Sequence, residues 1–136
     1  PSMLIFDASN RDQCEVQRGR TNTPLQALVM MNDPHVMESS RVLASHLSAE
    51  KGSLDVVLSK AFRKIICRKP SEKELIILKR YFENEQASFK KEPNKIEKLM
   101  KIGEYKKDPG AVRFYTAALM QTIQLIYNME EALIRV

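Results

Sequence analysis

The sequence predicts an all-α protein, a compact bundle of about six helices preceded by an extended N-terminal arm. Two observations support this prediction. Helix-start signals recur along residues 23–136, and apolar residues follow each signal at intervals of three or four positions. Residues 1–22 lack that periodicity and no strand alternation follows them, so we predict an arm (1–22) that packs on a single helical domain (23–136).

The first predicted helix begins at Pro24, where proline suits the first helical position. Thr23 precedes it as the N-cap, and Gln26 stands where its side chain can bond back to the Thr23 backbone, which makes a capping box. The apolar positions that follow have the spacing of a buried stripe: Leu25, Leu28 and Val29. We therefore expect this stripe to face the bundle.

Two more helices follow at similar signals. Asp33 is the expected N-cap and Pro34 the first residue of the second helix, which Gly52 ends. Ser53 caps the third helix and Pro70 closes it. The third helix has the most regular apolar face in the chain: Leu54, Val57, Leu58, Ala61, Phe62 and Ile65.

The C-terminal half continues the same pattern. Ser71 and Glu74 form a second capping box that opens a long fourth helix, and Pro93 breaks it before a shorter fifth helix around residues 96–100. The last helix is expected over about residues 111–135 and near the centre of the bundle, because its apolar residues form a heptad-like seam. A solenoid of helical hairpins is the alternative layout, but no repeat of about 34 residues links the helices.

Composition argues against several classes of function. The net charge of +5 arises largely from lysines spread among glutamates between residues 79 and 107, which indicates a solvated face rather than a nucleic-acid interface. No apolar run of about 18 residues is present, so we predict no transmembrane segment. Cys14 and Cys67 belong to no CxxC or CxxCH motif, and His35 and His46 are the only histidines, so we expect neither a metal site nor covalent haem in this chain. Whether the two cysteines are free or paired stays open.

A candidate anion site precedes the first helix. Its residues are Arg18, Arg20, Thr21 and Asn22. A helix start offers unsatisfied N–H groups and a partial positive charge, and two guanidinium groups there suit a carboxylate, sulfate or phosphate. In the structural alternative, which we favour, the arginines instead pair with carboxylates of the arm and hold it on the bundle. These carboxylates belong to Asp7, Asp12 and Glu15.

Other reactive side chains lack the partners that catalysis or metal binding requires. The three arm carboxylates do not follow the spacing of a calcium-binding loop and have no glycine at its bend. Cys14 has no base placed to activate it, so we predict a buried structural cysteine. Glu130 and Glu131 are adjacent on a helix and point apart, and we expect Glu131 to cap a helix or pair with an arginine. No catalytic residue is predicted.

One long segment and several short ones form a family signature. Residues 6–44 read FDASNRDQCEVQRGRTNTPLQALVMMNDPHVMESSRVLA. The structural signature positions within them are Asp7, Arg11, Cys14, Thr23, Pro24, Gln26, Asn32 and Asp33. Shorter segments of the signature are residues 61–63, 68–71, 74–75, 101–104 and 128–131. Together these segments resemble the C-terminal part of domain of unknown function 1553, found in planctomycete-type cytochrome c-associated proteins.

The resemblance implies a place in the cell envelope or periplasm and an origin as part of a longer exported protein. We expect such an origin also because the chain starts at Pro1 without a methionine or a signal peptide. Upstream domains of the same polypeptide are the implied partners, and in many family members one of them is a cytochrome c-like haem domain. The resemblance implies no activity, and we expect no cofactor in this chain itself.

The predicted function is that of a helical interaction or substrate-positioning module of a larger envelope protein. The alternative is part of an envelope redox or hydrolytic enzyme that acts on acidic (sulfated or uronic) glycans, with Arg18 and Arg20 as the anion site. Nucleic-acid binding through the lysine-rich helices is a third and weaker option.

Overall fold

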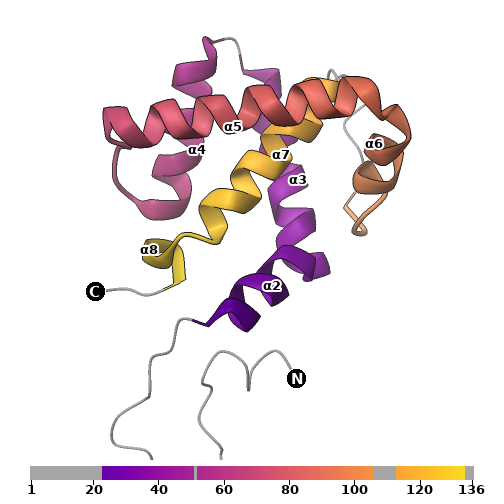
Figure 1. Ribbon diagram of the computed structural model, residues 1–136, viewed down its shortest axis with the longest axis horizontal. Helices are drawn as coiled ribbons and strands as arrows, with labels where there is room; N and C mark the ends of the chain where they lie inside the picture. Colours follow the sequence, from indigo (N-terminus) through magenta and orange to yellow (C-terminus); the bar gives the residue numbers. More distant parts are fainter. Residues whose placement is uncertain (1–22, 51, 106–112, 134–136) are drawn as a thin grey trace, which may run out of the picture.

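The computed structural model describes residues 23–50, 52–105 and 113–133, and in these ranges it consists of helices, turns and loops without a strand (Figure 1). The predicted all-α class is therefore confirmed. The helices are α2 (Pro24–Asn32), α3 (Pro34–Ala49), α4 (Leu54–Ile66), α5 (Glu72–Lys91), α6 (Pro93–Met100), α7 (Arg113–Tyr127) and α8 (Glu130–Leu133). The arm predicted over residues 1–22 lies outside the described residues.

Helix α7 forms the centre of the bundle. It packs against α3, α4, α5 and α6, and its contacts with α3 and α5 are the most extensive. Its fully buried apolar side chains are Ala117, Ala118, Leu119, Met120, Ile123 and Ile126. Because a helix covered by four neighbours must be apolar on several faces, the apolar seam correctly predicted the central position.

Helix α5 lies across α7 on one side of the bundle (Figure 1). Its inner face buries Leu78, Phe82 and Phe89. The Phe82 ring meets the Tyr115 ring of α7 edge to face, with 5.1 Å between the ring centroids, which is a favoured aromatic geometry. Aromatic packing therefore joins these two helices, and the opposite face of α5 is left to solvent.

The starts of α2 to α5 lie where the local signals predict them. Their N-caps are Thr23, Asp33, Ser53 and Ser71. Both predicted capping boxes form, whereas the Ser53 side chain makes no cap hydrogen bond. Helix α4 ends before Pro70, because Cys67 adopts a left-handed conformation with φ of 67° and terminates the helix after Ile66.

The last helix is shorter than predicted. A single helix over residues 111–135 was expected, but α7 ends at Tyr127 and the separate short helix α8 follows at Glu130. Asn128 lies at the break, where its side-chain amide donates to the carbonyl oxygen of Gln124 at 3.2 Å. The backbone N–H of Asn128 also reaches the Leu125 carbonyl oxygen, and that of Met129 bonds to Ile126, so the hydrogen bonds change to a spacing of three residues where α7 ends.

The prediction that the α2 stripe faces the bundle is wrong for two of its three residues. Leu25 and Leu28 are each 56% exposed, and Val29 is partly buried. Helix α2 packs mainly on α3 at one end of the bundle, so few described elements lie near enough to cover its apolar side chains (Figure 1). The buried residue of α2 is instead the polar Gln26, which is 3% exposed.

Candidate functional site

The candidate anion site lies outside the described residues. This applies to Arg18, Arg20, Thr21 and Asn22, and to the signature residues Asp7, Arg11 and Cys14. The structure describes the other signature residues, which are Thr23, Pro24, Gln26, Asn32 and Asp33. These residues show what the signature does at the start of α2 and at the junction of α2 with α3.

The described signature residues build helix ends. The backbone N–H of Thr23 donates to Gln26 Oε1 at 2.9 Å, and the backbone N–H of Gln26 donates to Thr23 Oγ1 at 3.3 Å, which is the predicted capping box. Asn32 Nδ2 donates to the Leu28 carbonyl oxygen at 2.8 Å. Asp33 Oδ1 accepts from the backbone N–H of His35 at 2.8 Å and caps α3. Each of the four residues thus contributes a hydrogen bond at a helix end.

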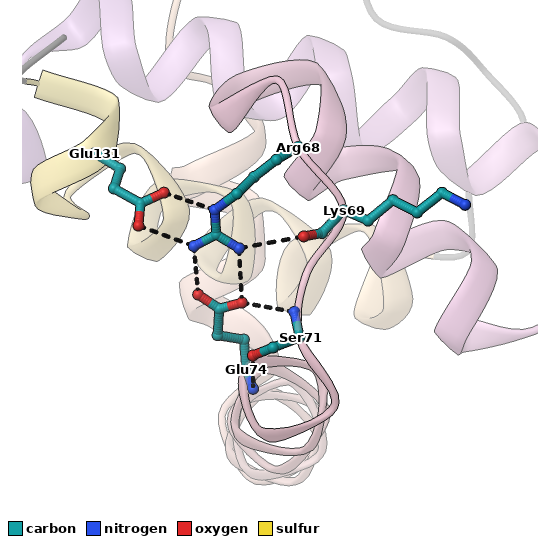
Figure 2. Close-up of polar contacts among 5 residues, drawn as sticks. All are labelled: Arg68, Lys69, Ser71, Glu74 and Glu131. Carbon is teal, nitrogen blue, oxygen red and sulfur yellow. Dashed lines mark hydrogen bonds and ion pairs between the residues drawn. The ribbon is translucent and has the colours of Figure 1, made fainter. Parts of the chain in front are cut away.

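The side chain of Arg68 joins two segments that are far apart in the sequence (Figure 2). Its guanidinium donates two hydrogen bonds to Glu74, at 2.9 and 2.7 Å, and two to Glu131, at 2.8 and 2.9 Å. A fifth N–H donates to the Lys69 carbonyl oxygen at 3.2 Å. Because a guanidinium has five N–H donors, every donor of Arg68 is used within the protein.

The electrostatics of this cluster follow from the same contacts. The hydrogen bonds from Arg68 and from the Ser71 backbone lower the pKa of Glu74 to about 2. The hydrogen bond from Arg68 also lowers the pKa of Glu131, and the two carboxylates raise the pKa of the guanidinium. The guanidinium carbon lies 4.9 Å from the centroid of the Phe62 ring, which adds a cation–π contact.

The Arg68 cluster acts as a structural clamp. It holds α8 against the corner between α4 and α5, and its guanidinium has no N–H left for an external anion. The sequence predicted the parts of this cluster separately: the Ser71–Glu74 capping box, and a helix cap or a pairing with an arginine for Glu131. Both are confirmed, but the identity of that arginine depends on the break between α7 and α8, which turns Glu131 toward Arg68 (Figure 2).

An open groove runs along one face of α3 and has a volume of about 920 Å³. Helix α3 contributes most of its lining, and α4, the loop after α6 and the end of α7 contribute the rest. The lining residues are His35, Glu38, Ser39, Val42, Leu43, His46, Lys64, Glu104, Tyr105 and Tyr127. The groove therefore combines both imidazoles of the chain with two phenol rings and an ammonium group.

A buried arginine holds one wall of the α3 groove in place. Arg41 is 3% exposed, and it donates from Nε to the Ile102 carbonyl oxygen at 3.0 Å and from Nη2 to the Tyr105 carbonyl oxygen at 2.9 Å. Glu38 Oε1 accepts from the backbone N–H of Tyr105 at 2.6 Å. Hydrogen bonds to charged groups are stronger than neutral ones, so three of them define the position of this loop.

Gly103 allows the loop to approach α3 closely. Its φ is +88°, and a Cβ atom at this position would lie 2.3 Å from Cδ of Glu38. Only glycine combines this backbone conformation with such a close contact. The Lys101–Glu104 segment, which belongs to the sequence signature, therefore brings Glu104 and the following Tyr105 into the lining of the groove.

The α3 groove offers binding groups rather than a recognisable catalytic arrangement. Imidazole, hydroxyl and ammonium groups can donate hydrogen bonds to a ligand, and the phenol rings can stack against it. Within the described ranges there is no group of three or more His, Cys, Asp or Glu side chains that could hold a metal ion. Cys67 carries a free, exposed thiol and does not line this groove.

The sequence did not predict the α3 groove. His35, Ser39, Val42 and His46 recur at intervals of four, three and four residues, so the sequence does place them on one face of a helix. That signal is weak, because the same spacing describes an ordinary solvated face. The opposing wall, with Glu104 and Tyr105, depends on long-range contacts with Arg41 that the sequence does not reveal.

The fold and the groove together define an all-α module with an open groove along α3 that is lined by both apolar and polar side chains. Over residues 1–82 of its 136, the chain matches the family model PSD1, described as protein of unknown function (DUF1553). Because this match covers more than half of the chain, the protein belongs to that family, as its sequence signature indicated. No curated protein and no solved structure matches the chain. None of the described helices is both long enough and apolar enough to cross a membrane.

Proposed function

We propose that this chain is a helical interaction or substrate-positioning module of a larger envelope protein, and that the α3 groove holds the ligand. The observation that supports this proposal is the buried Arg41, whose hydrogen bonds hold the wall that carries Glu104 and Tyr105. A wall that is already ordered loses little conformational freedom on binding, so more of the contact energy remains as affinity.

The lining of the α3 groove indicates the chemistry of its ligand. Tyr105 and Tyr127 offer phenol rings for stacking, and His35 and His46 offer ring nitrogens for hydrogen bonds. Lys64 adds a positive charge at the edge. We therefore propose a ligand that has several hydroxyl or acidic groups together with a flat apolar face, rather than a purely apolar molecule.

The groove can be tested by titration followed by NMR. The probes are glucuronate, a sulfated monosaccharide, inorganic phosphate and an uncharged disaccharide. At least one probe should shift the imidazole signals of His35 and His46 in a saturable way. The variant Tyr105→Ala should weaken that binding about tenfold. The control Lys98→Ala, on an exposed position of α6, should leave it unchanged.

Two results would refute the groove proposal. One is that no probe at millimolar concentration shifts either imidazole signal. The other is that Tyr105→Ala binds the active probe as tightly as the native chain does. Either result would leave the α3 groove as an ordinary surface depression.

A second candidate function is part of an envelope redox or hydrolytic enzyme acting on acidic glycans. It is supported by the Thr23–Gln26 capping box, in which local side chains satisfy two backbone N–H groups at the start of α2. On this proposal, sulfate or uronate should raise the Tm of the native chain but not that of Arg20→Ala. If Arg20→Ala lowers the Tm without ligand and the ligand effect persists, the arginine is a structural residue instead.

We further propose that the longer protein is located in the cell envelope and carries haem in a domain upstream of this chain. Family membership supports this proposal, together with the resemblance of the sequence to planctomycete-type cytochrome c-associated proteins. Fractionation of cells that express the full-length gene should place the protein in the envelope, and the purified protein should show a haem absorbance band. Recovery in the cytoplasm, or a protein without that band, would contradict the respective part of the proposal.

A further inference from the structure

Two adjacent isoleucines on α5 are the most exposed large apolar side chains among the described residues. Ile76 is 66% exposed and Ile77 is 62% exposed. Isoleucine is a weaker helix former than alanine or leucine, and neither side chain fills the core. Helix propensity and core packing therefore give no reason for two isoleucines here. Together the two side chains form a small contiguous apolar surface that a partner can cover.

Two cations extend the same surface. Lys73 lies one turn before the isoleucines and Arg80 one turn after them, and both side chains are exposed. Neither cation forms an ion pair within the part of the chain that the structure describes. By contrast, the neighbouring Lys79 is paired with Asp55 at 2.9 Å. The α5 outer face, defined by Lys73, Ile76, Ile77 and Arg80, thus combines uncovered aliphatic surface with unpaired positive charge.

We propose that the α5 outer face docks an amphipathic helix of a partner protein, and that this helix presents aliphatic side chains flanked by Asp or Glu. The aliphatic side chains of the partner cover Ile76 and Ile77, while its carboxylates meet Lys73 and Arg80. Apolar anchors then supply affinity, and the complementary charges set the orientation and the rate of association. This surface is separate from the α3 groove, and the inference does not depend on the proposed function.

A second copy of this chain fits the α5 outer face poorly. If two α5 helices paired in antiparallel fashion about Ile76 and Ile77, Lys73 of each chain would oppose Arg80 of the other. A parallel two-fold pairing would place each cation beside its own counterpart. Both arrangements bring like charges together at a small interface, so the charge pattern favours an acidic partner over self-association.

An anionic membrane surface also fits less well than a protein helix. Helices that lie in a membrane surface bury a wide apolar face in the lipid, but α5 buries its wide apolar face in the protein core. What remains exposed is one isoleucine pair. Glu72 lies one turn before Ile76 and Glu83 one turn after Arg80, and both oppose anionic headgroups. A partner helix that places a few carboxylates beside Lys73 and Arg80 avoids that repulsion.

A selection experiment tests the proposal with defined probes. A display library of helical peptides is selected on the purified chain at low ionic strength, and enriched peptides are measured by fluorescence anisotropy. Enriched peptides should carry aliphatic residues flanked by Asp or Glu. The double substitution Ile76→Ser and Ile77→Ser, and separately Arg80→Glu, should weaken binding at least about tenfold. Val56→Ser is the matched control, because Val56 is also an exposed apolar residue (46%) on another helix.

Several outcomes would overturn the proposal. The proposal is wrong if the enriched peptides lack acidic residues. It is also wrong if the double isoleucine variant binds the enriched peptides as tightly as the native chain does. Self-association in sedimentation velocity that the double variant abolishes would assign the face to a second copy. Binding to phosphatidylglycerol vesicles without peptide binding would assign it to a membrane. Far-UV circular dichroism confirms that each variant is folded. Tyr105→Ala should bind the peptides normally, so this proposal and the groove proposal can fail separately.

Discussion

Replacing Arg41 by methionine should destabilise the protein and release the loop that forms one wall of the α3 groove. The Arg41 side chain is buried, and it donates hydrogen bonds to the carbonyl oxygens of Ile102 and Tyr105 at 3.0 and 2.9 Å. Methionine keeps much of the aliphatic volume but has no donor. Both carbonyl groups therefore lose their bond, while the packing around position 41 is largely kept.

Two opposing effects set the size of the change. Hydrogen bonds from a charged group contribute about 1.5–3 kcal/mol each, so the loss of two costs about 3–6 kcal/mol. Removing a buried guanidinium relieves its desolvation, and water can reach the carbonyl of the exposed Tyr105. We expect a net loss of about 3 kcal/mol in the free energy of unfolding, which corresponds to a decrease in Tm of about 10 °C for a chain of this length.

Urea unfolding and thermal unfolding, both followed by circular dichroism, measure this loss directly. Arg63→Met is the matched control, because Arg63 is an exposed arginine on α4 without an ion pair among the described residues, and its Tm should stay within about 2 °C. Hydrogen exchange at the Tyr105 amide should become faster in Arg41→Met. Equal Tm values for the two variants, or unchanged exchange at Tyr105, would refute the assignment of Arg41 as the residue that holds the groove wall.

Two further predictions concern Gly103 and the Arg68 cluster. Gly103→Ala should cost about 1–3 kcal/mol of stability, because its φ is +88° and the added Cβ would lie 2.3 Å from Glu38. At Gly52 an added Cβ would lie 3.6 Å from its nearest neighbour, Cγ1 of Val56, so Gly52→Ala should be close to neutral in urea unfolding. Similar losses of stability in the two alanine variants would contradict the prediction. The pKa of Glu74 in the folded protein is about 2, below the usual value of 4.5. The ionised carboxylate therefore stabilises the folded protein above about pH 4.5, and this stabilisation is lost as the pH falls toward 2. Between pH 5 and pH 2, the free energy of unfolding should therefore fall less in Arg68→Gln than in the native chain. Equal decreases in the two proteins would contradict this prediction.

Local signals were sufficient where the interacting groups are close in the sequence. The capping boxes at Thr23–Gln26 and Ser71–Glu74 each join residues three positions apart, so their hydrogen bonds can be predicted without knowledge of the tertiary structure. The same holds for Asp33, whose carboxylate accepts from the backbone at the start of its own helix. These residues are the part of the family signature whose role the sequence could predict.

The spacing of apolar residues predicted burial and helix ends less reliably than the capping signals predicted helix starts. The α2 stripe has a helical spacing, yet Leu25 and Leu28 are largely exposed, because a spacing shows which residues share a face but not whether another element covers it. The seam of the last helix predicted its central position but not the break at Asn128. The backbone hydrogen bonds change to a spacing of three residues at Asn128 and Met129, and α7 ends there although apolar residues follow.

The sequence by itself determined the all-α class, the helix starts and the apolar faces that meet in the core, since these depend on groups a few positions apart. Tertiary structure alone decided which residues form the α3 groove and the Arg68 clamp. Arg41 reaches Ile102 and Tyr105, and Arg68 reaches Glu131, only after α3, α4 and α7 have packed together. A charged side chain carries no local mark of its distant partner, because that partner is selected by the path of the whole chain.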